Sequence, residues 1–125
     1  MDVTPLIRQG QKIIQSYSGG TFRIGGELFS GPVIVTPDHV MPWAVSGTFA
    51  SLKDTDFAPL AGVDRPDVVL IGTGQSMQML MPGLRKALKA MDLSADSMDT
   101  GAACRTYNVL MAEGRRVAAA LLPYA

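Results

Sequence analysis

The pattern of hydrophobic and polar positions changes along the chain near residue 54. In the first part, short apolar runs are separated by Gly and Pro at intervals typical of consecutive β-hairpins. The turns at Gly19-Gly20 and Gly25-Gly26 separate the first of these runs. Pro42 interrupts the last run, which favours an edge or irregular strand there. The expected strands are 13–17, 21–24, 27–29, 33–36 and the broken run 40–45.

The second part reads as strands that alternate with helices. After a short helical turn at 56–60, the continuous apolar run 67–71 is typical of a strand covered on both faces. Pro82 opens a helix to about residue 91, with Leu84, Leu88 and Met91 on one face. Further strands are expected at 95–98 and 116–122.

Between those last two strands, residues 101–113 form an amphipathic helix. Thr100 is the expected N-cap, and Gly114 stands where a left-handed residue ends a helix. Its expected buried face holds Ala103, Tyr107, Leu110 and Met111. The element order predicts an α/β layered core to which the N-terminal hairpins are added. Strands 68–71, 95–98 and 117–121 should be neighbours in one sheet, with both helices packed on it.

Composition narrows the class of protein. A chain of 125 residues that is 47% apolar is long enough for one folded domain, which we place at 1–125. It carries 11 basic and 11 acidic residues, scattered rather than grouped. A nucleic-acid partner would require a positive patch, so none is expected.

Cysteine usage and apolar run length bear on location. Cys104 is the single cysteine, which excludes an intrachain disulfide and fits a reducing compartment. No apolar segment typical of a signal peptide follows Met1–Pro5, and the runs 68–71 and 117–122 are too short to span a membrane. We therefore expect a cytoplasmic protein without a membrane span.

Gly72-Thr73-Gly74 directly follows a buried strand. Glycines let a backbone approach an anion, and ligands of α/β sheets bind beyond the carboxyl ends of strands. The segment lacks the spacing of the known phosphate-binding motifs. A tight strand exit that requires positive φ is therefore favoured over a phosphate site, whereas a binding crevice of some kind at this strand end stays open.

Thr100, Arg105 and Asn108 are the other candidate binding residues. Arg105 and Asn108 are three residues apart and share a helix face. Arg offers a fork that suits carboxylate or phosphate, and Asn both donates and accepts. If Arg105 belongs to an anion-binding crevice, its guanidinium should point into a cleft with Thr73 or Thr100 within reach and have no acidic partner. Asn108 should bond to backbone near 72–74 or Thr100. The alternative is structural: a cap, an ion pair and a bond to buried backbone.

The remaining reactive residues favour no catalytic site. Cys104 is read as a buried, inert thiol, because the lone His39 has no matching acid or base nearby in sequence. With one histidine and one cysteine, the chain lacks the Cys/His cluster of a zinc site, and no cofactor is expected. Trp43 is expected in the core. The alternating methionines, Met77, Met79 and Met81, are also expected to pack on the core. The alternative is a surface that binds partners, because methionine side chains adapt to irregular and varied surfaces.

Four segments together carry a family resemblance: 70–74, Met98-Asp99-Thr100, Ala102–Asn108 and Glu113-Gly114-Arg115. They resemble the Mth-domain family of small proteins of unknown function, whose members include a mitochondrial respiratory complex I assembly factor and an adipogenesis-associated protein. The resemblance implies a three-layer α/β fold around a mixed, mostly parallel sheet with one antiparallel strand, plus β-hairpins. It also implies protein partners such as respiratory complex subunits or assembly factors.

Two functions follow as hypotheses. The first is a non-enzymatic interaction or assembly protein. It is supported by the resemblance and by the lack of a recognisable combination of catalytic residues in the sequence. The second is a small-molecule or anion-binding domain, with enzymatic activity as an option. Its crevice would be formed by Gly72, Thr73, Gly74, Thr100, Arg105 and Asn108. An enclosed pocket with convergent polar groups would favour the second. The sequence leaves the partner, the ligand and the oligomeric state open.

Overall fold

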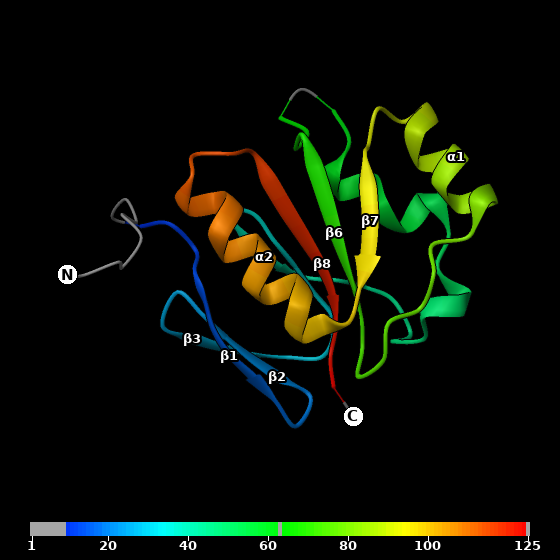
Figure 1. The fold of residues 1–125 in the computed structure, drawn as a ribbon. Coiled ribbons are helices and arrows are strands. Elements are labelled where there is room, and N and C mark those ends of the chain that lie inside the picture. The colour runs from blue at the N-terminus through cyan, green and yellow to red at the C-terminus, as the bar shows by residue number, and fades with distance from the viewer. Residues whose placement is uncertain (1–9, 63, 125) are drawn as a thin grey trace.

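The computed structural model describes residues 10–62 and 64–124, so the signal-peptide prediction for residues 1–5 lies outside the described residues. Three N-terminal strands form one antiparallel sheet in the order β1-β2-β3, and five further strands form a second sheet in the order β5-β4-β8-β6-β7 (Figure 1). The strands are β1 (Ile14–Ser18), β2 (Thr21–Ile24), β3 (Glu27–Ser30), β4 (Val33–Val35), β5 (Val40–Pro42), β6 (Val68–Thr73), β7 (Ala95–Met98) and β8 (Val117–Leu122).

Four helices complete the described part of the chain: the 3-10 helices η1 (Phe49–Ser51) and η2 (Asp54–Leu60), and the α-helices α1 (Pro82–Ala90) and α2 (Thr100–Ala112). The predicted elements are therefore confirmed to within about two residues, apart from the run 40–45, of which only 40–42 pairs as a strand. Pro42 ends β5 at the edge of its sheet, where a missing N–H costs no ladder bond.

Strand directions in the five-stranded sheet are mixed. Strand β6 pairs in parallel with both β7 and β8, whereas β4 is antiparallel to β8 and β5. Four strands thus run one way and β4 runs the other, as the resemblance implies. Counted as pairings over both sheets, four are antiparallel and two parallel, because the N-terminal hairpins add two antiparallel pairings.

The five-stranded sheet forms the middle of three layers. Alternate residues of β6 and β8 enter opposite cores: Val69 and Ile71 pack with Leu88 of α1 and with η2, whereas Leu70 packs toward α2 and the hairpin sheet. All six residues of β8 are buried, as a strand covered on both faces requires. Helix α2 crosses one face of the sheet in Figure 1, while η1, η2 and α1 cover the other.

The predicted sheet neighbours are confirmed, with β6 lying between β7 and β8. Their carboxyl ends, which hold Gly72, Thr73 and Met98, therefore meet at one end of the sheet. Within the described residues, no helix has both the length and the apolar character needed to cross a membrane.

Candidate functional site

The predicted glycine turn at the end of β6 is joined to the start of α2. The backbone N–H of Gly74 donates to the Thr100 hydroxyl at 2.8 Å, and Thr100 N–H donates to the Gly74 carbonyl at 2.9 Å. The Thr100 hydroxyl in turn donates to the carbonyl of Leu122 on β8. The hydroxyl is completely buried and links three segments, so these groups already have partners within the chain.

The two glycines of the turn serve different purposes. Gly74 has φ of +98°, the left-handed region that L side chains avoid, as the strand-exit interpretation expects. Gly72 instead lies beneath α2, where a Cβ atom would come within 2.8 Å of the Thr100 hydroxyl oxygen and 2.9 Å of Leu121 Cδ2. Glycine at 72 thus permits the close approach of the helix to the sheet.

The N-cap of α2 differs from the prediction. Asp99 is the capping residue, with its carboxylate accepting from the Ala102 N–H at 2.9 Å, whereas Thr100 is the first helical residue. The prediction of Thr100 was wrong because both residue types can cap. Here the Thr100 side chain turns inward toward β6 and β8, which leaves the capping position to the aspartate.

Thr73 organises the loop that follows β6. Its buried hydroxyl donates toward the Ser76 carbonyl at 2.6 Å and the Met98 carbonyl at 3.2 Å, and it accepts from the Gln78 N–H at 3.1 Å. This hydroxyl therefore fixes the shape of residues 74–78.

Arg105 and Asn108 share a face of α2, as predicted, but that face contacts β1. Asn108 bonds to both backbone groups of Ile14, so its predicted bonds to the 72–74 turn or Thr100 are wrong. The exposed Arg105 guanidinium donates to the Tyr17 hydroxyl at 3.0 Å. The two ion pairs found in the described part of the chain, Arg85–Asp96 and Arg116–Asp67, do not involve it. Three-residue spacing correctly indicated a shared face but not what that face meets.

Two tyrosines that were not predicted as site residues meet at the start of α2. Tyr17 and Tyr124 pack edge to face with ring centroids 5.3 Å apart. The Tyr124 hydroxyl accepts from the Gly101 N–H at 3.3 Å, and a Cβ on Gly101 would lie within 2.8 Å of both hydroxyls. Glycine in the first turn of a helix, where it weakens helix formation, is the sequence signal for this contact.

Cys104 is buried on α2, as expected. Burial raises the pKa of its thiol from 9.0 to about 12, which outweighs the opposite effect of the nearby Arg105 cation. The thiolate that a nucleophile needs is therefore scarce at neutral pH. Burial also raises the pKa of Tyr107, with the Asp38 carboxylate acting in the same direction. Within residues 10–62 and 64–124, no three His, Cys, Asp or Glu side chains gather into a metal-binding group.

A cleft lies at the opposite end of the sheet from the predicted crevice. Its volume is about 530 Å³, and it lies between the β4–β5 turn, the segment after η2 and the entry to β8. The charged side chains that line it are Asp38, Asp64, Arg115 and Arg116, and His39 lies among them. Of these, Arg116 already pairs with Asp67 at 3.0 Å.

The three alternating methionines are exposed, so their expected place in the core is wrong. The exposed fractions are 56% for Met77, 71% for Met79 and 64% for Met81, whereas Leu80 between them is 3% exposed. Trp43, by contrast, is buried as expected. Its indole N–H donates to the Asp56 carbonyl at 2.8 Å, and its ring packs on Phe57.

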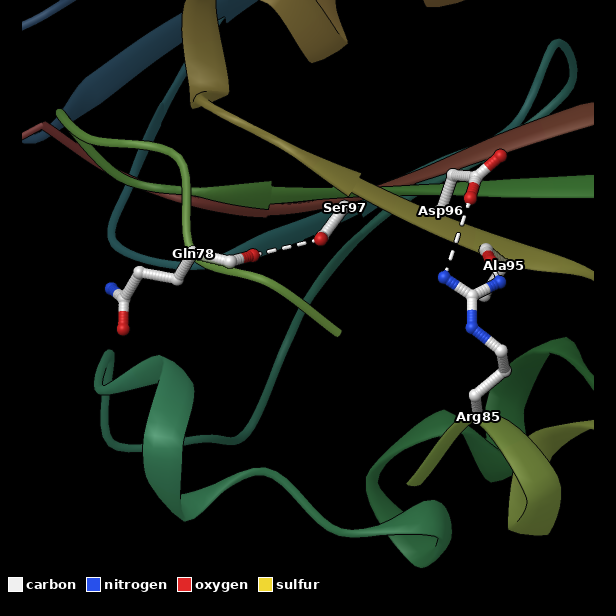
Figure 2. A network of polar contacts seen from close by, with 5 residues as sticks. All are labelled: Gln78, Arg85, Ala95, Asp96 and Ser97. Carbon is white, nitrogen blue, oxygen red and sulfur yellow. Dashed lines mark hydrogen bonds and ion pairs between the residues drawn. The ribbon is translucent and has the colours of Figure 1, made fainter. Parts of the chain in front are cut away.

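Contacts with β7 hold residues 77–81, the methionine segment, in place (Figure 2). The Ser97 hydroxyl donates to the Gln78 carbonyl at 2.7 Å. Beside it, Arg85 of α1 donates to the Ala95 carbonyl at 3.1 Å and lies 3.6 Å from the Asp96 carboxylate.

A family model described as protein of unknown function (DUF498/DUF598) matches residues 14–122. The chain belongs to this family. A solution structure of a Bordetella pertussis protein, described as a Mth938-like domain, superposes with a TM-score of 0.79 at 31% identity, covering 98% of this chain and 92% of that one. The predicted resemblance to the Mth-domain family is thereby confirmed, and so is its fold.

Two proteins similar in sequence carry different names, one uncharacterized and the other an assembly factor. An uncharacterized protein of Rhodobacter capsulatus is 40% identical over 110 residues, which span 88% of this chain and 83% of that protein. The NADH dehydrogenase (ubiquinone) 1 alpha subcomplex assembly factor 3 of Bos taurus is 32% identical over 111 residues. That match covers 88% of this chain but 60% of the bovine factor, so the chain spans less than two thirds of that relative.

Proposed function

We propose that this Mth-domain protein is a non-enzymatic interaction protein of the assembly-factor kind, which binds another protein through an exposed methionine segment. The observation that carries the proposal is the exposure of Met77, Met79 and Met81 on one fixed loop. Unbranched, polarizable methionine side chains adapt to the shape of a partner, and exposed apolar groups in proximity mark interaction sites.

Two observations support this function over catalysis. The polar groups expected to form a reactive crevice are engaged inside the chain, with Thr73 and Thr100 bonded to backbone and Asn108 to Ile14. The bovine relative is named as an assembly factor, and we extend the same kind of role, with respiratory complex subunits or assembly factors as partners, to this chain. A cytoplasmic location belongs to the same proposal, and cell fractionation tests it.

Site-specific crosslinking tests the proposed function. A photoreactive phenylalanine analogue replaces Met79 in cells of the natural host, and crosslinked proteins are identified by mass spectrometry. We expect one defined partner, whose purified form binds the wild-type chain and loses at least tenfold in affinity for the triple variant M77S/M79S/M81S. The double variant L28S/V109S, which alters exposed apolar side chains elsewhere, is the control. No partner, or equal binding by the triple variant, would refute the proposal.

Binding of a small anion is the second candidate, favoured by the cleft. Its volume of about 530 Å³ falls within the range of ligand pockets. Arg115 lines it without an ion pair in the described part of the chain. A titration with inorganic phosphate and acetate, monitored by NMR, tests this function. Loss of binding in Arg115→Ala would place the anion in the cleft, whereas loss in Arg105→Ala would place it outside the cleft, on the face of α2 where Arg105 meets Tyr17. No binding to the wild-type chain excludes both for these anions.

A further inference from the structure

Contacts of the Gln78 backbone and of the Leu80 side chain hold the methionine segment, residues 77–81, in place. Gln78 is fixed through its N–H to Thr73 and through its carbonyl to Ser97, and Leu80 is buried in the core. Leu80 is buried, whereas Met77, Gln78, Met79 and Met81 are all exposed, so the three methionines are accessible together. Little conformational entropy of the backbone is then lost when a partner binds.

Basic residues follow this segment on α1. Met81 is the N-cap of α1, and Lys86 and Lys89 lie on the exposed part of that helix, three residues apart. Neither lysine takes part in an ion pair in the described residues. From Gly74 to Met91 the sequence contains three cations and no acid. The methionines are thus followed along the chain by positive charge that is not neutralised within the same stretch.

The neighbouring sheet edge is closed to strand addition. The Ser94 carbonyl accepts from Val69 of β6, so the next carbonyl, that of Ala95, points to the free edge of β7. Arg85 occupies that carbonyl and also contacts Asp96 across the edge (Figure 2). A charged side chain on an edge strand blocks pairing with another chain. These contacts of Arg85 favour a partner that binds through side chains.

We propose that Met77, Met79, Met81, Lys86 and Lys89 form one docking surface, the methionine–lysine surface, for an acidic amphipathic helix of another protein. The apolar face of that helix would lie on the methionines and its carboxylates near the lysines. Residues 77–81 span at most ~13 Å, and residues 82–89 of α1 add ~12 Å. A helix of about sixteen residues covers that length. This inference rests on the proposed function and adds the chemistry of the partner.

Side-chain chemistry distinguishes this occupant from a lipid surface. Segments that enter the membrane interface typically present Trp, Phe or Leu beside their cations. Here the three exposed apolar side chains are methionines, which suit the irregular surface of a protein helix.

A peptide selection against the intact chain tests the inference. Random eighteen-residue peptides are displayed and selected for binding, and the enriched peptides are titrated into protein labelled with ¹³C at the methionine methyl groups. We expect enriched peptides with net negative charge and apolar residues three and four apart, which shift the methyl signals of Met77, Met79 and Met81. The variant K86E/K89E should weaken binding at least tenfold, whereas R23E/K53E, with the same change in net charge on exposed cations elsewhere, should change it less than twofold.

Each other outcome overturns the inference. Enriched peptides that are basic, that bind elsewhere, or that are not obtained at all contradict an acidic helix. Methyl shifts produced by phosphatidylglycerol vesicles but not by peptides would indicate a membrane, and shifts that depend on protein concentration alone would indicate a second copy. If crosslinking at position 79 still yields a partner, the proposed function survives the failure of this inference; if crosslinking also fails, both are wrong.

Discussion

The side-chain amide of Asn108 on α2 is paired with both backbone polar groups of Ile14 on β1. Its Oδ1 accepts from the Ile14 N–H at 2.9 Å, and its Nδ2 donates to the Ile14 carbonyl at 2.8 Å. These bonds join residues 94 positions apart and attach the hairpin sheet to the helix that packs on the central sheet. The hairpins are therefore held by a polar clamp in addition to apolar packing.

Replacing Asn108 by leucine should lower the free energy of unfolding by about 1–3 kcal/mol, because two backbone groups of Ile14 lose their partners. Thermal and urea unfolding measure the change. Asn108→Asp should also destabilise, since it keeps the acceptor for the N–H but loses the donor to the carbonyl. Val109→Leu at the adjacent exposed position is the control, expected within about 0.5 kcal/mol of wild type. An unchanged melting temperature for Asn108→Leu would contradict the clamp.

Adding one methyl group at Gly72 should destabilise the protein by about 1–3 kcal/mol, because the site is overpacked. The new Cβ would meet the Thr100 hydroxyl oxygen at 2.8 Å and its Cα at 3.1 Å. Gly83→Ala on α1 is the matched control. Its Cβ meets nothing within 4 Å, so the higher helix propensity of alanine should leave stability unchanged or raise it. Equal effects at the two positions in urea unfolding would show that the close approach at 72 does not matter.

Thr100→Val keeps the shape of the side chain but removes the hydroxyl that links Gly74 and Leu122. Two buried backbone groups would be left unpaired, and a loss of about 1–3 kcal/mol in unfolding free energy is expected. Thr106→Val, on the same helix but only half-buried, should have an effect within about 0.5 kcal/mol. Hydrogen exchange of the Gly74 amide should also accelerate in Thr100→Val alone; a protected amide in that variant would contradict the assigned bond.

Stability should fall as pH rises above about 9. The folded-state pKa of Cys104 is raised from 9.0 to about 12, so between these values the native state holds a proton that the unfolded chain releases. The stabilising contribution is complete below pH 9 and is lost progressively toward pH 12. Tyr107, whose pKa is also raised by burial, acts in the same direction. Urea unfolding at pH 8 to 11 measures the slope.

Cys104→Ala separates the thiol from the tyrosine in this pH dependence. The variant should reduce the slope by at most ~1.4 kcal/mol per pH unit, the value for one proton, and leave the part due to Tyr107. In the wild-type protein, a thiol reagent at pH 8 should modify Cys104 much more slowly in buffer than in denaturant, because the native thiol is buried and protonated. Equally fast labelling in both would show an accessible thiol.

Much of the fold could be predicted because its signals are local. The apolar run that becomes β6, the Pro that opens α1 and the Gly after α2 each act within a few residues. Those signals determined where the strands and helices lie. They also determined that Gly72, Thr73 and Thr100 meet at one end of the sheet, since parallel strands bring their carboxyl ends together.

The candidate site depended on partners that are distant in sequence. Both Asp99 and Thr100 could cap α2, and the position of β6 and β8 decided between them, because the Thr100 hydroxyl is bonded to Gly74 and Leu122. The helix face that holds Arg105 and Asn108 was predictable from their spacing. That this face meets β1 rather than the strand ends was decided by the packing of the N-terminal hairpins.

The methionine segment shows most clearly what the sequence determined and what only the tertiary structure decided. The sequence by itself determined an alternation of Met77, Met79 and Met81 with Gln78 and Leu80. It left open which set faces the core, because alternation has the same period in either orientation. Tertiary structure decided the outcome: the core takes Leu80, whereas Gln78, held at its backbone by Thr73 and Ser97, is exposed together with the three methionines.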